Sequence, residues 1–245
     1  MRNMSTLALL ICWIGWIPSG AFGQQVSRNA QDPCEAPTFH GRTYQTVRIG
    51  ERCWFKENLY SIRYANGDAV PDGASEFDWV QPDRDFYTDY GKSESIAAKY
   101  GKLYNWYAVT DPRGLCPEGW HVSTDADWQA LEVAIGMDAA TVGNPGKRNS
   151  ENTGQGAAIK DPKTWPDGRK ASDKHGFTAT PGGARLPDSS FHTAGSGACF
   201  WTATAETDST AWFRGLGNLH DGIYRSGFSK QSGFSVRCVE DESTD

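Results

Sequence analysis

The chain has 245 residues and a formal net charge of −6, and charged residues make up 22% of it. No lysine- and arginine-rich stripe offsets the negative charge, which argues against nucleic acid or an anionic membrane surface as a partner. The 10 tryptophans and 27 glycines indicate one globular domain with many turns around an aromatic core.

Residues 1–23 have the features of a secretory signal peptide. Arg2 supplies a positive charge, residues 6–17 are apolar, and small residues precede a cleavage point after Gly23. The apolar run is too short for an ordinary membrane span, and no later segment approaches the required length. A lipoprotein anchor at Cys12 is the alternative, but a large isoleucine precedes it where a small residue is usual. We expect a secreted or cell-surface protein that begins with a polar leader over residues 24–40.

The first regular pattern after the leader predicts a β-hairpin. Residues 43–49 alternate and are rich in β-branched side chains, Gly50-Glu51 forms a turn, and the strand pattern resumes at residues 53–55. Residues 61–99 are weakly patterned.

A helix is predicted to begin at Thr124. The threonine hydroxyl can accept a hydrogen bond from an unpaired amide, and the acids Asp125 and Asp127 suit the positive end of the helix dipole. Gly136 provides a stop. The expected apolar stripe consists of Trp128, Leu131 and Ile135.

Residues 137–176 are rich in Gly, Pro, Asn, Asp and Lys, which predicts a long irregular excursion. Short aromatic strands are expected after it. They span residues 198–204, 210–216, 223–228 and 234–239.

Two segments are the most informative motifs of the chain: GWHVSTDADWQALE at 119–132 and GFSVRCV at 233–239. Together with residues 100–108 and Cys116-Pro117, they resemble the Fibrobacter succinogenes major paralogous domain over residues 41–241. The resemblance implies an α+β, C-type lectin-like fold with two helices, short antiparallel strands and a long irregular excursion. It also implies that the aromatic stripe of residues 101–110 is helical.

Five cysteines follow the signal peptide, and in an exported protein they are expected to form disulfides. A Cys116–Cys238 bridge would tie the start of the helical layer to the closing strand. Cys34 and Cys53 flank the predicted hairpin and form the second expected pair. Cys199 is then left as a buried, inert thiol, because its neighbours are apolar.

In lectin-like domains the excursion and the late strands form the ligand face, while the hairpin and helices are scaffold. Of the residues that the resemblance carries over, Trp165 is expected to be exposed in a polar loop. Trp201 and Trp212 are either ligand residues or part of the core. Carbohydrate is the leading ligand class, because flat aromatic rings stack on sugars. A structural or cell-surface protein-contact module is the alternative. The residues of the predicted face are Trp165, Asp167, Arg185, Phe200, Trp201, Trp212, Arg214, His220, Tyr224 and Arg225.

An enzyme is less favoured. Residues 124–128, 181–183 and 233–234 also resemble formylglycine-generating enzymes, which bind copper through paired cysteines between the last two of these motifs. Here that interval holds Cys199 alone. No nucleophile elbow or phosphate-binding loop occurs, and the histidines have no evident nucleophile partner.

We predict no catalytic metal site and no cofactor. The triplet Gln81-Pro82-Asp83 matches the letters of a calcium-dependent lectin loop, but it precedes the helical motif instead of following it. A structural calcium ion, held by loop carboxylates such as Asp161, Asp167 and Asp173, remains an open alternative.

Overall fold

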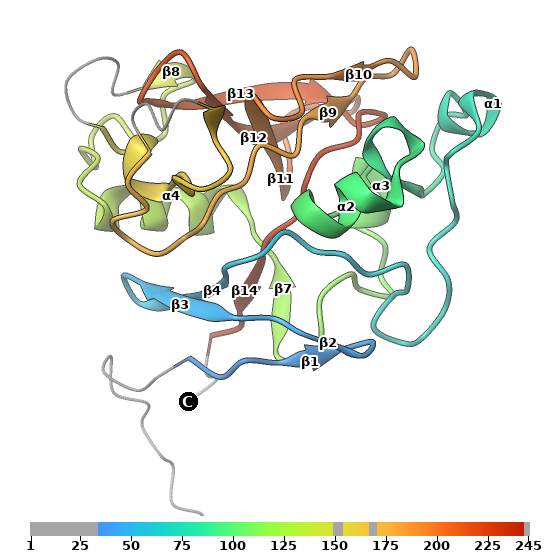
Figure 1. Ribbon diagram of the computed structural model, residues 1–245, viewed down its shortest axis with the longest axis horizontal. Coiled ribbons are helices and arrows are strands. Elements are labelled where there is room, and N and C mark those ends of the chain that lie inside the picture. The colour runs from blue at the N-terminus through green and yellow to red at the C-terminus, as the bar shows by residue number, and fades with distance from the viewer. Residues whose placement is uncertain (1–33, 149–153, 167–170, 243–245) are drawn as a thin grey trace, which may run out of the picture.

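The first and last parts of the domain meet in one antiparallel sheet. In this computed structural model, which describes residues 34–148, 154–166 and 171–242, β3 (Thr46–Ile49) and β4 (Arg52–Phe55) form the expected hairpin. β4 pairs with the closing strand β14 (Cys238–Glu240), which also pairs with β7 (Trp120–Val122). Figure 1 shows this sheet in the lower half of the molecule. The predicted signal peptide and its cleavage point lie outside the described residues.

A second antiparallel sheet is built from the late strands. β11 (Gly197–Ala205), β12 (Thr210–Gly217) and β13 (Ile223–Ser229) follow one another as expected. Its fourth strand, β8 (Gly146–Arg148), pairs with β13 and comes from the segment that was expected to be irregular. That expectation was wrong at this point, because a turn-rich composition does not prevent a short strand from pairing with a sheet edge.

The helix α4 (Asp125–Ala134) begins where the sequence predicts. The amide of Asp127 donates to Thr124 Oγ1 at 3.2 Å, and the amide of Thr124 donates to the Asp127 carboxylate at 2.8 Å, which completes a capping box. Gly136 follows the last turn with φ 99°. The predicted apolar stripe faces the core: Trp128, Leu131 and Ile135 are all buried.

The predicted single helix over residues 101–110 was wrong. Leu103 and Tyr104 form the strand β6, which pairs with β5 (Tyr87–Thr88). The helix α3 (Trp106–Val109) follows only after Asn105, whose side chain accepts from the amide of Ala108. The two residues of β6 are both buried, so the apolar run here begins as a buried strand and becomes helical only after Asn105.

The remaining elements are short and lie mostly at the periphery (Figure 1). They are β1 (Thr38–Phe39), β2 (Arg42–Thr43), α1 (Glu76–Trp79), η1 (Tyr90–Lys92), α2 (Glu94–Tyr100), η2 (Ala157–Ile159), β9 (Ala184–Arg185) and β10 (Phe191–His192). Within the described ranges, no helix has both the length and the apolar character needed to span a bilayer.

Both expected disulfides are confirmed. Cys116 is bonded to Cys238, 122 residues later, and Cys34 is bonded to Cys53. The second bond, together with the pairing of β1 with β2, brings residues 34–40 into the fold. This part of the expected leader is therefore structured.

A buried ionic network joins α4 to the second sheet. Arg214 and Arg225, from β12 and β13, donate to the Asp125 carboxylate at 2.7–2.9 Å, and Arg214 also donates to Glu132 at 2.7 Å. Burial alone would raise the pKa of Asp125, but the two guanidinium groups outweigh it and lower that pKa to about 2. Asp125 therefore does more than complement the helix dipole: it fixes the helix on the sheet.

We predict that Trp128→Ala lowers the free energy of unfolding by about 3–5 kcal/mol, because it leaves a cavity among the rings of Trp54, Phe177 and Phe200. Denaturant titration measures the change. Phe77→Ala is the matched control, since 75% of the Phe77 side chain is exposed and little stability should be lost. Equal losses in both variants would contradict this assignment of the core.

We predict that Asp125→Asn destabilises the domain by about 3–5 kcal/mol, because it removes the carboxylate that pairs with the buried Arg225 guanidinium and one of the two carboxylates that pair with Arg214. In the native chain, the contribution of Asp125 is complete above the unfolded pKa near 4 and is lost as the pH falls from about 4 to about 2. Melting curves over this range, with the exposed Asp208→Asn as control, measure it. If Asp125→Asn and its control gave identical pH profiles, the network would not carry this stability.

Candidate functional site

Most of the ligand face expected from the resemblance lies in the core. Trp165 was predicted to be exposed, but only 4% of it is accessible and its indole N–H donates to Ala179 O at 2.7 Å. That prediction was wrong, because polar neighbours in the sequence do not show which way a side chain points, and the Trp165 side chain turns inward. Asp167 lies outside the described residues. The other members of the face that are buried are Arg185, Phe200, Trp201, Arg214 and Arg225.

The arginines of this face have structural partners. Arg214 and Arg225 hold Asp125, as described above, and the Arg225 guanidinium also lies 3.5 Å from the centroid of the half-buried Trp212 ring. Arg185 donates to Gly73 O and Ser189 O and lies against the Trp79 ring. These groups join segments of the chain and are not available to a ligand in this structure.

Two members of the predicted face do lie together at the surface. His220 and Tyr224 line a shallow, largely apolar depression of about 370 Å³ over β11 and β12. Its floor is formed partly by the backbone of Gly197, Gly215 and Gly217, with Cys199 beside them. Few polar groups converge on this depression, so it offers little to orient a ligand.

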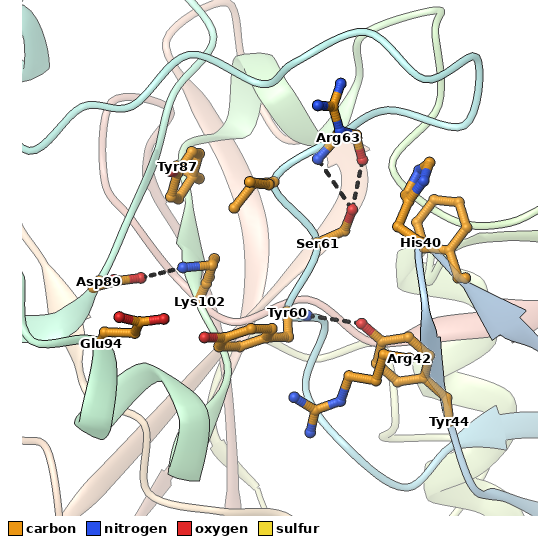
Figure 2. A pocket seen from close by; sticks show the side chains of 12 residues that line it. His40, Arg42, Tyr44, Tyr60, Ser61, Arg63, Tyr87, Asp89, Glu94 and Lys102 are labelled. Atoms are coloured by element: carbon orange, nitrogen blue, oxygen red, sulfur yellow. Dashed lines mark hydrogen bonds and ion pairs between the residues drawn. The ribbon is translucent and has the colours of Figure 1, made fainter.

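A more polar cavity, which we call the Tyr60 cleft, lies beside β1 and β2 and was not predicted from the sequence. Its volume is about 460 Å³, and β1, β2, the segment 60–63, β5 and α2 contribute to its walls (Figure 2). Aromatic rings and charged groups alternate around it. The lining residues are Phe39, His40, Arg42, Tyr44, Tyr60, Ser61, Ile62, Arg63, Tyr87, Asp89, Glu94 and Lys102.

Backbone pairing in the core positions the floor of the cleft. The Leu59 amide donates to Val236 O, and the Lys102 amide donates to Leu59 O, both at 3.0 Å. Gly101, with φ 84°, makes this approach possible, because a Cβ there would lie 2.5 Å from Asn58 Cβ. As a result, the side chains of Tyr60 and Lys102 lie next to each other where the two segments cross.

One wall of the cleft is built around Lys102. Its ammonium group donates to Asp89 Oδ1 at 2.5 Å and lies 4.6 and 4.9 Å from the ring centroids of Tyr60 and Tyr87. Burial, followed by the nearby Asp72 and Asp89 carboxylates, raises the pKa of Tyr87 to about 12, so its hydroxyl stays protonated and can donate. The ion pair keeps Lys102 between the two rings.

The opposite wall is formed by β2 and the β1–β2 turn. The Tyr44 hydroxyl accepts from the Tyr60 amide at 3.1 Å, and its ring stacks on Phe55, which fixes the position of Tyr44. His40 Nε2 donates to Tyr64 O at 2.9 Å. In Figure 2 the Tyr60 ring lies between Arg42 on this side and Glu94 on the other. The cleft thus presents a flat ring flanked by hydrogen-bonding groups of both signs.

The sequence held only a partial signal for this site. Lys102 lies within the motif segment 100–108, but Arg42 is at the border of the predicted hairpin and Asp89 and Glu94 lie in the weakly patterned segment. These residues are spread over 60 positions, from Arg42 to Lys102, and are brought together by tertiary contacts that no local pattern encodes.

The loop carboxylates considered for calcium are engaged locally where they are described. Asp161 accepts from the Lys163 amide, and Asp173 accepts from the amide and hydroxyl of Thr178. Among the described residues, no group of three or more His, Cys, Asp and Glu side chains is arranged to hold a metal ion.

The family model for the Fibrobacter succinogenes major domain matches residues 47–240. Comparison with curated proteins found no match, and neither did comparison with solved structures. The matched region runs from β3 to the end of β14 and so contains both sheets and α4. The chain therefore belongs to the Fibrobacter succinogenes major domain family.

Proposed function

We propose that the chain is a secreted or cell-surface carbohydrate-binding module that holds its ligand in the Tyr60 cleft. The observation that carries this proposal is the Tyr60 ring, which lies in the cleft between Arg42 and Glu94 (Figure 2). A ring of this kind can contact the apolar carbons of a sugar, while the charged groups beside it exchange hydrogen bonds with the hydroxyls. The volume of about 460 Å³ is in the range of small-ligand pockets.

The proposed architecture is C-type lectin-like. It is supported by the pairing of the early hairpin with β14, by α4 packed on the second sheet, and by the run of antiparallel strands from β11 to β13. Two disulfides support the extracytoplasmic location, because such bonds persist in oxidising compartments. In this proposal the ligand lies beside β1 and β2 and not on the late strands.

A protein-contact module is the second candidate, and one observation favours it. Phe77 in α1 and Val80 at its C-cap are 75% and 44% exposed, although large apolar side chains more often lie inside. They would serve as anchors for a cell-surface protein.

We predict that Tyr60→Ala weakens sugar capture at least about tenfold, a factor worth about 1.4 kcal/mol, with little change in melting temperature. The sugar is chosen from a glycan array probed with the mature chain, with and without calcium, and titration calorimetry then measures its affinity for both proteins. Phe77→Ala is the matched control, because it truncates an exposed ring outside the cleft.

The two candidate functions predict opposite results. If Tyr60→Ala bound the selected sugar as tightly as the native chain, the cleft would not be the sugar site. If the array showed no sugar binding and Phe77→Ala abolished attachment to the cell surface, the protein-contact function would replace the first. Binding only in the presence of calcium would require a cation site that the cleft residues do not provide.

We propose that the chain does not act as a copper-dependent oxidase, because the part of the chain that the structure describes holds no second free thiol beside Cys199. Cys199 is half-buried beside the depression over β11 and β12, and desolvation raises the pKa of its thiol to about 12, so the thiol stays protonated at neutral pH. We expect Ellman's reagent to label the native chain much more slowly than the unfolded chain, and the chain to retain no stoichiometric copper. Rapid labelling of the native chain, or copper bound one to one, would contradict this proposal.

A further inference from the structure

The Tyr60 cleft is more positive than the rest of the molecule. Arg42, Arg63 and Lys102 line it against two acids, Asp89 and Glu94, whereas the whole chain carries a net charge of −6. Asp89 is neutralised by Lys102 at 2.5 Å. The charges that remain for a ligand are two guanidinium groups and one carboxylate.

Arg42 is the cation best placed to receive an anion. Its guanidinium carbon lies 5.0 Å from the Tyr60 centroid and 5.5 Å from the Tyr44 centroid, so the two rings restrict it. Among the described residues, it has no hydrogen-bond acceptor and no acidic partner. Arg63, by contrast, already donates to Gly67 O at 2.8 Å. A planar guanidinium fork with open donors matches the two oxygens of a carboxylate.

Glu94 defines the other end of the cleft. It is the first residue of α2, it is exposed, and no described cation pairs with it. A carboxylate can only accept hydrogen bonds, so it suits the hydroxyls of a ligand and repels an anion. The Tyr60 ring separates this acceptor from the Arg42 donors (Figure 2). The cleft therefore has a hydrogen-bond donor end at Arg42 and an acceptor end at Glu94.

We propose that the ligand of the Tyr60 cleft is an acidic sugar, a uronic acid residue whose carboxylate binds the Arg42 guanidinium while its apolar carbons contact Tyr60 and its hydroxyls donate to Glu94. This inference rests on the proposed carbohydrate function and adds the class of sugar and the orientation in which it binds. Arg42 is then the residue that selects an acidic sugar over a neutral one.

Titration calorimetry of the mature chain tests it with trigalacturonic acid and its methyl ester, in which each carboxylate is replaced by a neutral ester group. We expect the acid to bind at least about tenfold more tightly, and this preference to shrink as salt rises from about 50 to about 500 mM. Arg42→Gln should bind both sugars with the affinity of the ester, and Arg42→Lys should keep part of the preference. Arg48→Gln, on β3 outside the cleft, is the control and should bind as the native chain does.

The outcomes separate the two levels of the proposal. If acid and ester bound equally and Tyr60→Ala weakened both, the acidic-sugar inference would be overturned and the carbohydrate function would stand. If Arg42→Gln kept the full preference for the acid while melting as the native chain does, the role of Arg42 would be wrong. A sulfated oligosaccharide bound in preference to the uronic acid would also overturn the inference. If no sugar bound at all, both levels would fail.

Discussion

The buried guanidinium of Arg237 is the group on which the arrangement of the chain most depends. Among the residues that the structure describes, it has no carboxylate partner within hydrogen-bond distance. It is satisfied instead by four oxygen acceptors: Phe55 O, Phe177 O and Asn58 Oδ1 at 2.7 Å, and Thr178 O at 2.9 Å. Complete burial lowers its pKa to about 9. A buried charge is tolerated only when its donors are satisfied. The segments 55–58 and 177–178 must therefore meet around Arg237, just before β14.

The same cluster reaches the Tyr60 cleft. Asn58, which accepts from Arg237, donates through Nδ2 to Tyr100 O at 2.7 Å and to Ser235 Oγ at 3.1 Å. Gly101 crosses against Asn58. Just after this crossing, one segment continues to Tyr60 and the other to Lys102, which both line the cleft. The Cys116–Cys238 bond anchors the residue after Arg237 to the segment before β7. Core and cleft are therefore parts of one structure, and loss of the core would misplace the cleft.

Buried arginines explain why most of the expected ligand face lies in the core and not at the surface. Arginine and tryptophan together are typical of binding surfaces, but they also make good core partners when acceptors and rings are supplied by other segments. Arg214 and Arg225 donate to Asp125, and Arg185 donates to Gly73 O and packs on the Trp79 ring. Trp165 is satisfied by a single carbonyl, that of Ala179. None of these partners is adjacent in the sequence.

The sequence alone determined the hairpin over β3 and β4, the capped start of α4 with its buried stripe and the strands β11 to β13, and its motifs indicated the two disulfides and the family. These follow from side-chain periodicity, from one hydroxyl and one carboxylate at a helix start, and from motifs read in order. Tertiary structure decided which polar side chains are buried and where a cavity opens. The strand at Leu103–Tyr104, the inward Trp165 and the cleft between Arg42 and Glu94 all depend on partners more than ten residues away. Local composition cannot identify such partners, because burial and pairing are settled only when distant segments compete for the same space.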